Sequence, residues 1–283
     1  LKEKIEKIGK PLKDWDVKIY RGILTGLNEA FIITTEKRAE ILRNCKTEEE
    51  RKRTEKIIKP ILRGRDIKRY YYEWAGLWII VIPAGWTNKN KGVEKPEVFI
   101  EKTFPSLMNH LKNFEDAAKK RQDKGDYWWE LRHCDYYEEF EKEKIIWQEL
   151  AQGSQFAYDE NKKFFVSNTA YILTGKRLKY LIGYLNSRLN EFVFEKWYCT
   201  KLGSLGTRWL HQHVLEIPVA TINSFNESTI KEIELCVEKI INANKKNLTF
   251  NNSKYENQIN QLIYKLYSLK EHEIKFIENY NYV

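Results

Sequence analysis

The sequence predicts a mixed α/β (α+β) fold, in which a sheet-containing domain is followed by a helical hairpin. Short runs of β-branched and aromatic residues, bounded by Gly, Pro, Asn or Ser, recur up to residue 174 and are typical of strands. After residue 220, apolar residues instead repeat at the spacing of amphipathic helices. We therefore divide the chain into one domain at residues 1–220 and a C-terminal helical hairpin at residues 221–283.

The chain opens with a strand–loop–strand pattern. Strands are predicted at WDVKIY (15–20) and AFIIT (30–34), which are rich in β-branched and aromatic residues. The connecting segment contains Gly22 and Gly26. One interpretation of this connection is a hairpin that needs the two glycines for its turn.

Charged helices are predicted next, at residues 34–44 and 47–58. Thr47 and Glu50 have the spacing of a capping box at the start of the second helix, and Pro60 is expected to close it.

Two further elements precede the middle of the chain. The apolar run GLWIIVIP (76–83) is short and bounded by Gly and Pro, which favours a buried strand. Residues 106–123 carry apolar side chains at helical spacing, so we expect a helix there.

The centre of the chain is predicted to be rich in sheet. Residues 144–174 contain four candidate strands separated by turn-forming residues such as Gly153 and Asn161. A helical apolar stripe follows at 176–197.

The predicted hairpin consists of amphipathic helices at residues 228–248 and 253–277. Ser253 and Ser268 each precede a glutamate by three residues, which is again capping-box spacing. We expect the hairpin to pack on the preceding domain or on another domain of the same protein.

Cysteine spacing and hydropathy indicate the cellular environment of the protein. The four cysteines are scattered and include no C-x-x-C pair, which favours a reduced, cytoplasmic setting. No apolar run approaches the roughly 20 residues that span a bilayer, so the chain is not expected to be anchored in a membrane. Because the chain begins at Leu1 without Met, we expect it to be part of a longer protein.

The sequence contains no complete catalytic motif. None of the six prolines is followed by another proline, so the Pro-Pro-aromatic loop of amino-methylating enzymes is missing. The thirteen glycines form no G-x-G pair, which argues against a nucleotide cofactor. His211 and His213 lack a nearby acidic or thiolate cluster and are interpreted as ordinary polar or core residues. We expect no catalytic residue, cofactor or metal in this chain.

Two other functional classes stay open. Asp66 and Lys68 match the short half of a metal-dependent nuclease motif, although no Pro-Asp pair is present and such triplets arise by chance in a chain with 31% charged residues. The terminal hairpin could alternatively form a coiled-coil dimer, which would make the chain an interaction module.

The charge distribution points to a polyanionic partner. Residues 1–125 hold 29 Lys and Arg against 19 Asp and Glu, a net charge of +10, whereas residues 126–283 have a net charge of −1. Each phosphate that Lys or Arg neutralises releases condensed counterions, so nucleic acid is the leading partner class and an acidic membrane surface the second.

Arg, Lys and aromatic residues are interleaved in three segments, IIKPILRGRDIKRYYYEW (57–74), RQDKGDYWWELRHC (121–134) and KLGSLGTRWLHQH (201–213). Because Arg forks suit both phosphate and guanine and Asn suits adenine, a loop with Arg21, Thr25 and Asn28 could also enter a DNA groove. The candidate contacts are Arg21, Thr25, Asn28, Arg63, Arg65, Lys68, Arg121, Lys124, Arg132, Lys201, Ser204, Thr207 and Arg208.

Roles within this set follow from residue type. Arg63, Arg65 and Lys68 are predicted to bind phosphates, and Arg21, Thr25, Asn28, Thr207 and Arg208 to approach base edges. For each of the cations, a plain solvated face is the competing interpretation. The aromatic residues of the three segments are predicted mainly to pack in the core.

These segments, in this order, resemble the TaqI-like C-terminal specificity domain of type IIG restriction enzymes and related adenine-specific DNA methyltransferases. The resemblance covers nearly the whole chain, and it is carried by WDVKIYRGILTGLNEAFII, LRGRDIKRYYYEWAGLWII, RQDKGDYWWELRHC, FFVSNTAYILTG, LKYLIGYLNSRLNEFVF and IPVATI.

The resemblance implies sequence-specific recognition of double-stranded DNA. It also implies a parent restriction-modification protein with an S-adenosylmethionine-binding methyltransferase domain N-terminal to this one, and often a magnesium-dependent endonuclease domain before that. The target adenine would flip into the pocket of the methyltransferase domain. S-adenosylmethionine and magnesium are therefore expected in the parent enzyme and not in this chain.

Overall fold

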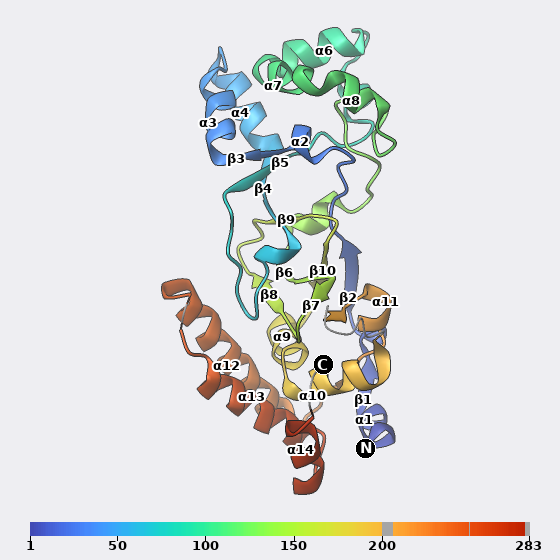
Figure 1. Ribbon diagram of the computed structural model, residues 1–283, viewed down its shortest axis with the longest axis vertical. Helices are drawn as coiled ribbons and strands as arrows, with labels where there is room; N and C mark the ends of the chain where they lie inside the picture. The colour runs from blue at the N-terminus through green and yellow to red at the C-terminus, as the bar shows by residue number, and fades with distance from the viewer. Residues whose placement is uncertain (200–205, 249, 281–283) are drawn as a thin grey trace.

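The computed structural model describes residues 1–199, 206–248 and 250–280. It is elongated, with a group of helices at one end, sheets in the middle and the C-terminal helices at the other end (Figure 1). The predicted mixed α/β fold is confirmed.

A four-stranded antiparallel sheet, here called the central sheet, lies in the middle of the molecule. Its order is β2-β10-β6-β8, formed by β2 (Val17–Arg21), β10 (Ala170–Gly175), β6 (Lys144–Gln148) and β8 (Phe156–Asp159). Alternate residues face opposite sides of a strand, and both faces of this sheet are buried. Ile145 and Leu173 belong to one apolar core, whereas Ile146 and Ile172 belong to the other.

A second sheet has the order β3-β5-β4-β9, with only the β4–β9 pair parallel. Its strands are β3 (Ile32–Thr34), β5 (Leu77–Ile80), β4 (Ile58–Leu62) and β9 (Phe165–Val166). The helices gathered at its end of the molecule (Figure 1) include α2 (Asn28–Phe31), α3 (Thr35–Arg43), α4 (Glu48–Ile57), α5 (Trp86–Asn90), α6 (Pro96–Thr103), α7 (Pro105–Leu111) and α8 (Glu115–Lys120).

Two short strand pairs join distant parts of the chain. β1 (Gly9–Pro11), which follows α1 (Lys2–Ile8), pairs with β12 (Pro218–Ala220), and β7 (Leu150–Ala151) pairs with β11 (Thr207–Arg208). The remaining short elements are α11 (His211–Val214), the 3-10 helices η1 (Leu12–Asp14), η2 (Gly64–Asp66), η3 (Lys112–Phe114) and η4 (Tyr137–Glu141), and the π-helical turn η5 (Phe194–Tyr198).

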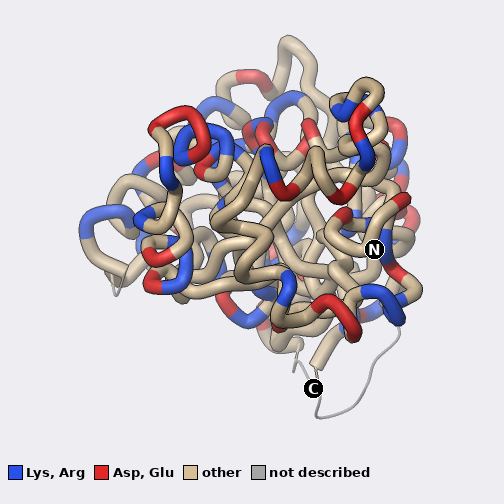
Figure 2. Tube along the Cα trace, turned by 90° about the horizontal axis from the view of Figure 1, so that it is seen from above, with Lys and Arg blue, Asp and Glu red and all other residues tan. Residues whose placement is uncertain are grey.

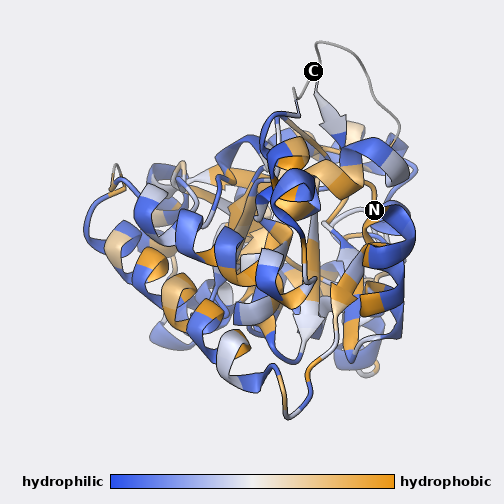
Figure 3. Cartoon of the chain, turned by 90° about the horizontal axis from the view of Figure 1, so that it is seen from below, coloured by the Kyte–Doolittle hydropathy of each residue, from blue (hydrophilic) through white to orange (hydrophobic). Residues whose placement is uncertain are grey.

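The other end of the molecule contains α1 together with α9 (Leu178–Leu185), α10 (Arg188–Val193), α12 (Glu227–Lys246), α13 (Ser253–Leu266) and α14 (Glu271–Glu278) (Figure 1). Seen from below, hydrophobic and hydrophilic residues occur on the same helices (Figure 3). A Cβ built on Gly183 of α9 would lie 2.8 Å from Ile233 Cγ2 of α12, so the glycine permits close packing of the two helices. Because α12 and α13 bury their apolar stripes in the same core as the central sheet, those stripes are occupied within the chain. The division at residue 220 stays a prediction.

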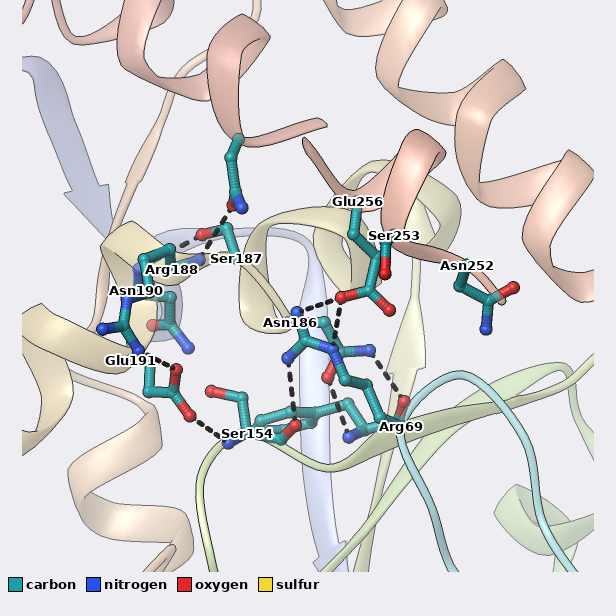
Figure 4. A network of polar contacts seen from close by, with 12 residues as sticks. Arg69, Ser154, Asn186, Ser187, Arg188, Asn190, Glu191, Asn252, Ser253 and Glu256 are labelled. Carbon is teal, nitrogen blue, oxygen red and sulfur yellow. Dashed lines mark hydrogen bonds and ion pairs between the residues drawn. The ribbon is translucent and has the colours of Figure 1, made fainter. Parts of the chain in front are cut away.

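A polar network fixes the C-terminal helices to the rest of the chain (Figure 4). Arg69 forms an ion pair with Glu256 of α13 at 2.9 Å and donates to the Ser154 carbonyl at 3.2 Å. The Asn186 amide brackets the backbone of Phe156, since it accepts from Phe156 N at 3.0 Å and donates to Phe156 O at 2.8 Å.

The structure corrects several predicted elements. β2 and β3 lie in different sheets, so the segment between them is not a hairpin. Residues 30 and 31 belong to α2 and not to a strand. The helix expected at 106–123 is divided into α7, η3 and α8, and the expected second helix of the hairpin is divided into α13 and α14.

The predicted capping signals are met only in part. The Thr47 hydroxyl accepts from Glu50 N at 3.1 Å, but the Glu50 carboxylate accepts from Lys46 N and Ser106 N. Pro60 lies inside β4, three residues beyond the end of α4. Neither C-terminal serine caps a helix, because α13 begins at Ser253 itself and the carboxylate that caps α14 is that of Glu273. No helix in the described part of the chain is long and apolar enough to cross a membrane.

Candidate nucleic-acid interface

A groove of about 530 Å³ lies at the junction of the two sheets. Segments from five parts of the chain line it, with Arg21, Asn28, Ile32, Arg63, Gly64, Arg65, Gln148, Glu149, Leu150, Ser167, Asn168 and Thr169 at its surface. The predicted contacts Arg21, Asn28, Arg63 and Arg65 are therefore brought together, although the sequence separates them by as many as 44 positions.

The wall of the groove depends on a close approach of two backbones. Ile23 forms a parallel bridge with Ser167, and Ile23 N donates to Val166 O at 2.8 Å. A Cβ on Gly22 would lie only 2.0 Å from Ser167 O. Glycine is thus required here for space, and this contact directs the chain from Arg21 into the groove.

One glutamate binds two of the predicted base-reading arginines. Glu149 Oε1 accepts from Arg208 Nε at 2.9 Å and lies 2.7 Å from Arg208 Nη2. Glu149 Oε2 lies 3.5 Å from Arg21 Nη2 and accepts from the Tyr171 hydroxyl at 3.2 Å. Burial and the negative charge of Glu149 raise the pKa of Tyr171, so that hydroxyl remains a donor at neutral pH. Arg21, Glu149 and Arg208 are called the Arg–Glu–Arg cluster below.

The three residues predicted to bind phosphates differ in the partners that they have within the chain. Arg63 binds the Asp66 carboxylate through Nε and Nη2 at 2.7–3.2 Å, and this hydrogen-bonded partner raises the pKa of Arg63. Lys68 Nζ donates to Arg65 O at 2.9 Å. The Arg65 side chain is exposed. Of the three, Arg65 is the cation most open to a polyanion.

In the loop before α2, a hydrogen bond from Thr25 orients Asn28. The Thr25 side chain is buried, and its hydroxyl donates to Asn28 Oδ1 at 2.6 Å while accepting from Leu27 N at 3.2 Å. Asn28 itself is exposed and lines the groove. The structure thus gives Thr25 a supporting position, with its hydroxyl engaged inside the loop, and leaves Asn28 accessible.

The segment 121–134 contributes one interior and two surface cations. Arg121 is only 7% exposed, and its guanidinium donates to the carbonyls of Thr25, Trp128 and Glu130. In this position it holds loops together and does not reach a ligand at the surface. Lys124 and Arg132 are exposed, with Arg132 paired to Asp123 at 3.2 Å.

The last predicted segment is described in part. Thr207 is buried and donates to Glu195 Oε1 at 2.9 Å, which makes it a support for β11 and not a surface group, whereas Arg208 is about half exposed. Lys201 and Ser204 lie outside the described residues.

Sequence reasoning missed several groove residues, among them Gln148, Glu149, Asn168 and Thr169. Glu149 is the charged residue among them. It follows directly after β6, whose residues are mostly buried, and this position is the signal that could have singled it out.

The aromatic residues near these segments pack mainly in the interior. Tyr70, Trp129 and Trp209 are nearly fully buried, as predicted for core residues. The Trp209 ring stacks on Phe194 with centroids 3.9 Å apart.

The side chains considered as metal ligands have other partners in the structure. The Asp66 carboxylate, proposed for a nuclease centre, is occupied by Arg63. His211 and His213 lie on α11, where His213 Nδ1 donates to the Tyr198 carbonyl. Among the described residues, no group of three or more His, Cys, Asp or Glu side chains is placed to hold a metal.

Lys and Arg are interspersed with Asp and Glu around the outside of the molecule (Figure 2). The basic character of residues 1–125 therefore does not gather into one single-sign face in that view. The groove and its arginines are the more specific feature.

Known proteins were compared with the chain in sequence and in structure. No curated protein matches the chain. The structure of the type IIL restriction-modification enzyme MmeI in complex with DNA is similar to this one, with a TM-score of 0.61 and 12% identity, over 95% of this chain and 35% of that one. The structure of the type IIG restriction endonuclease BpuSI is also similar, with a TM-score of 0.45 and 13% identity, over 94% of this chain and 32% of that one. The chain thus spans about a third of the length of these enzymes.

A family model for the TaqI-like C-terminal specificity domain matches residues 59–219, which is more than half of the chain. This segment includes β4, the central strands β6, β8 and β10, and most of the groove. The chain belongs to the TaqI-like C-terminal specificity domain family.

Proposed function

We propose that this chain recognises a base sequence in double-stranded DNA as the specificity domain of a restriction-modification enzyme. The observation that carries the proposal is the groove, where Arg21, Asn28 and Arg65 converge from separate segments of a specificity-domain fold. Arg and Asn are the side chains best suited to bidentate contacts with guanine and adenine.

Exposure divides the predicted contacts into two groups. Arg65, Lys124 and Arg132 are exposed cations with the reach to bind phosphates, and Lys68 lies beside Arg65. Arg21, Asn28 and Arg208 lie in or beside the groove and are the candidates for base edges. Thr25, Arg121 and Thr207 support these residues from the interior.

The catalytic chemistry would belong to the parent protein. We infer an adenine-methylating parent with an N-terminal S-adenosylmethionine-binding methyltransferase domain and, where it also cleaves, a magnesium-dependent nuclease domain, acting in the cytoplasm. The resemblance of the quoted motifs to type IIG enzymes supports this inference. The adenine would be flipped out of the duplex into the methyltransferase pocket while this domain contacts the flanking bases.

Selection from a mixed pool of duplexes tests the proposal. The 283-residue chain is incubated with a duplex library that has a randomised centre, and bound DNA is sequenced. We expect enrichment of one sequence, with affinity that falls steeply as salt rises because phosphate contacts release counterions. Binding without enrichment, or without salt dependence, would contradict sequence-specific recognition.

A further inference from the structure

We propose that Glu149 is a positioning residue that presents Arg21 and Arg208 to guanine edges and limits their binding to unrelated DNA. The inference rests on the proposed function, which does not itself require an acidic residue in a DNA-binding groove. A carboxylate in a DNA-binding groove repels phosphates and by itself weakens binding. Its presence there therefore indicates another function.

The first observation is that Glu149 is fixed in place. Its backbone N donates to Thr169 O at 2.9 Å, and its carbonyl accepts from Trp209 N at 2.7 Å. The side chain is only 15% exposed. With Tyr171 donating to Oε2, the carboxylate has little freedom to leave the two arginines.

Strand register explains why the three charges meet. Arg21 of β2 is the partner of Tyr171 in β10, and Tyr171 is the partner of Trp147 in β6. Cross-strand partners share a face of the sheet, and so do residues two apart. Glu149 lies one residue beyond β6 and continues the pairing through its hydrogen bond to Thr169 O, so we place it on the same face as Arg21. Arg208 arrives from β11, opposite Leu150.

The second observation is the way in which each guanidinium is bound. Arg208 uses Nε and Nη2 on Glu149, while Arg21 uses Nε on Asn168 O at 3.1 Å and Nη2 on Glu149. A guanidinium has five N–H donors in a rigid fork. Among the described residues, the two donors of Nη1 have no partner in either arginine. The side chains are 58% and 49% exposed for Arg21 and Arg208.

An arginine held by one edge is prepared for a bidentate contact with its outer edge. Guanine offers two neutral acceptors, O6 and N7, that match this fork. Because the fork is already oriented, less side-chain entropy is lost when the base is bound.

The charge of Glu149 acts in the same direction. The cluster carries a net charge of +1 where two free arginines would carry +2, so a phosphate near it gains less. Guanine O6 and N7 are uncharged and suffer less repulsion from the carboxylate. The cluster should therefore favour a base edge over the phosphate backbone, which is the discrimination that a specificity domain needs.

The test compares the wild-type 283-residue chain with Glu149→Gln and Glu149→Ala. The probes are the duplex enriched by the selection described above and an unrelated duplex of equal length. Loss of the carboxylate should raise affinity for the unrelated duplex about three- to tenfold near 0.1 M salt and steepen the salt slope by up to about one, the effect of one additional phosphate contact. Preference for the enriched duplex should fall about tenfold or more, as for one lost bidentate contact.

Two further comparisons separate positioning from net charge. Glu160→Gln removes a carboxylate paired with Lys245 at 2.5 Å, outside the groove, and makes the same change in net charge. This variant should change neither the affinity for the unrelated duplex nor the preference for the enriched one. Arg208→Lys keeps the charge but has no fork, and it should lower the preference while leaving affinity for the unrelated duplex unchanged.

The outcomes are distinguishable. If the wild-type chain enriches a sequence but Glu149→Gln and Glu149→Ala keep full preference, the role of Glu149 is refuted and the proposed function stands. An equal gain of unrelated binding in Glu160→Gln would likewise refute it. If the wild-type chain enriches nothing, the proposed function fails and the inference with it. Thermal unfolding of each variant shows whether it is folded, and Glu149→Gln preserves the shape of the side chain if Glu149→Ala does not fold.

Discussion

The Arg121 guanidinium lies over the ring of Phe31, with its central carbon 4.2 Å from the ring centroid. Because its N–H groups also donate to carbonyls of the loop at Thr25 and of the segment around Trp128, one buried cation joins two parts of the chain beside the groove. Burial lowers the pKa of Arg121 to about 10, which still leaves it protonated at neutral pH.

Replacing Arg121 should therefore affect stability more than DNA contact. Arg121→Met keeps much of the volume but leaves buried carbonyls without a donor, and it should lower the free energy of unfolding by about 3 kcal/mol. Chemical denaturation measures this. The matched control Arg132→Met removes an exposed cation paired with Asp123 and should change stability by less than about 1 kcal/mol. Equal losses in the two variants would show that Arg121 has no special supporting role.

Arg65 provides the opposite case. It is exposed at the groove, so Arg65→Ala should weaken binding to all duplexes alike and flatten the salt slope by about one, with stability changed by no more than about 0.5 kcal/mol. Binding titrations at several salt concentrations give both quantities. Lys275→Ala, which removes an exposed cation on α14, should leave the slope unchanged. A matching effect in that control would point to overall charge and not to a contact at the groove.

His110 should make stability depend on pH. Its ring Nε2 donates to Ala30 O at 3.0 Å, and burial lowers its pKa from 6.5, with the Lys37 charge acting in the same direction and Glu40 opposing it. Below pH 6.5 the unfolded chain binds more protons at this site than the folded chain. The stability contribution is thus complete above pH 6.5 and is lost as the pH falls through the lowered value.

Denaturation measured at pH 7 and at pH 5 tests this dependence. His110→Asn should lose less stability between the two pH values than the wild-type chain does. His272→Asn, at an exposed position on α14, should retain the wild-type loss. An unchanged pH dependence in His110→Asn would contradict the assignment.

Gly22 should tolerate no side chain. A methyl group would meet Ser167 O at 2.0 Å and Val166 O at 2.6 Å, both of them backbone atoms, so Gly22→Ala should destabilise by about 3 kcal/mol through overpacking. Gly92→Ala is the control, because its added Cβ meets nothing within 4 Å and only its positive φ of 57° costs energy, about 1 kcal/mol. Chemical denaturation of both variants separates the two causes, and a smaller loss for Gly22→Ala than for Gly92→Ala would be the contrary result.

The local patterns predicted most strands, whereas their partners could not be predicted. β5 and the strands between residues 144 and 174 were expected because β-branched and aromatic runs lie between turn residues. Nothing local shows that β2 pairs with β10 and β3 with β5, since pairing depends on which faces are buried together. Pro60 was expected to end a helix, but it lies in β4, where β5 pairs with it on one side and β9 pairs only with the two residues that follow it. A residue without an N–H fits best where a strand has no partner on one side.

In the candidate site, too, local sequence could predict residue types but not their tertiary partners. Arg65 and Arg121 have similar basic and polar neighbours in sequence, yet one is exposed and the other buried. The carbonyls that bind Arg121 are gathered by tertiary packing, so composition could not separate the two roles. Glu149 was overlooked for a similar reason, because its partners Arg21 and Arg208 are 128 and 59 positions away.

The pairing of β1 with β12 has a consequence for synthesis of the protein. Gly9 is the partner of Ala220, so the first strand cannot find its place until more than two hundred further residues have left the ribosome. β2 waits in the same way for β10. Contacts of such long range slow folding and leave strand edges open meanwhile. The N-terminal strands should thus stay exposed to chaperones during translation, and the domain should complete its fold only after most of it has been made.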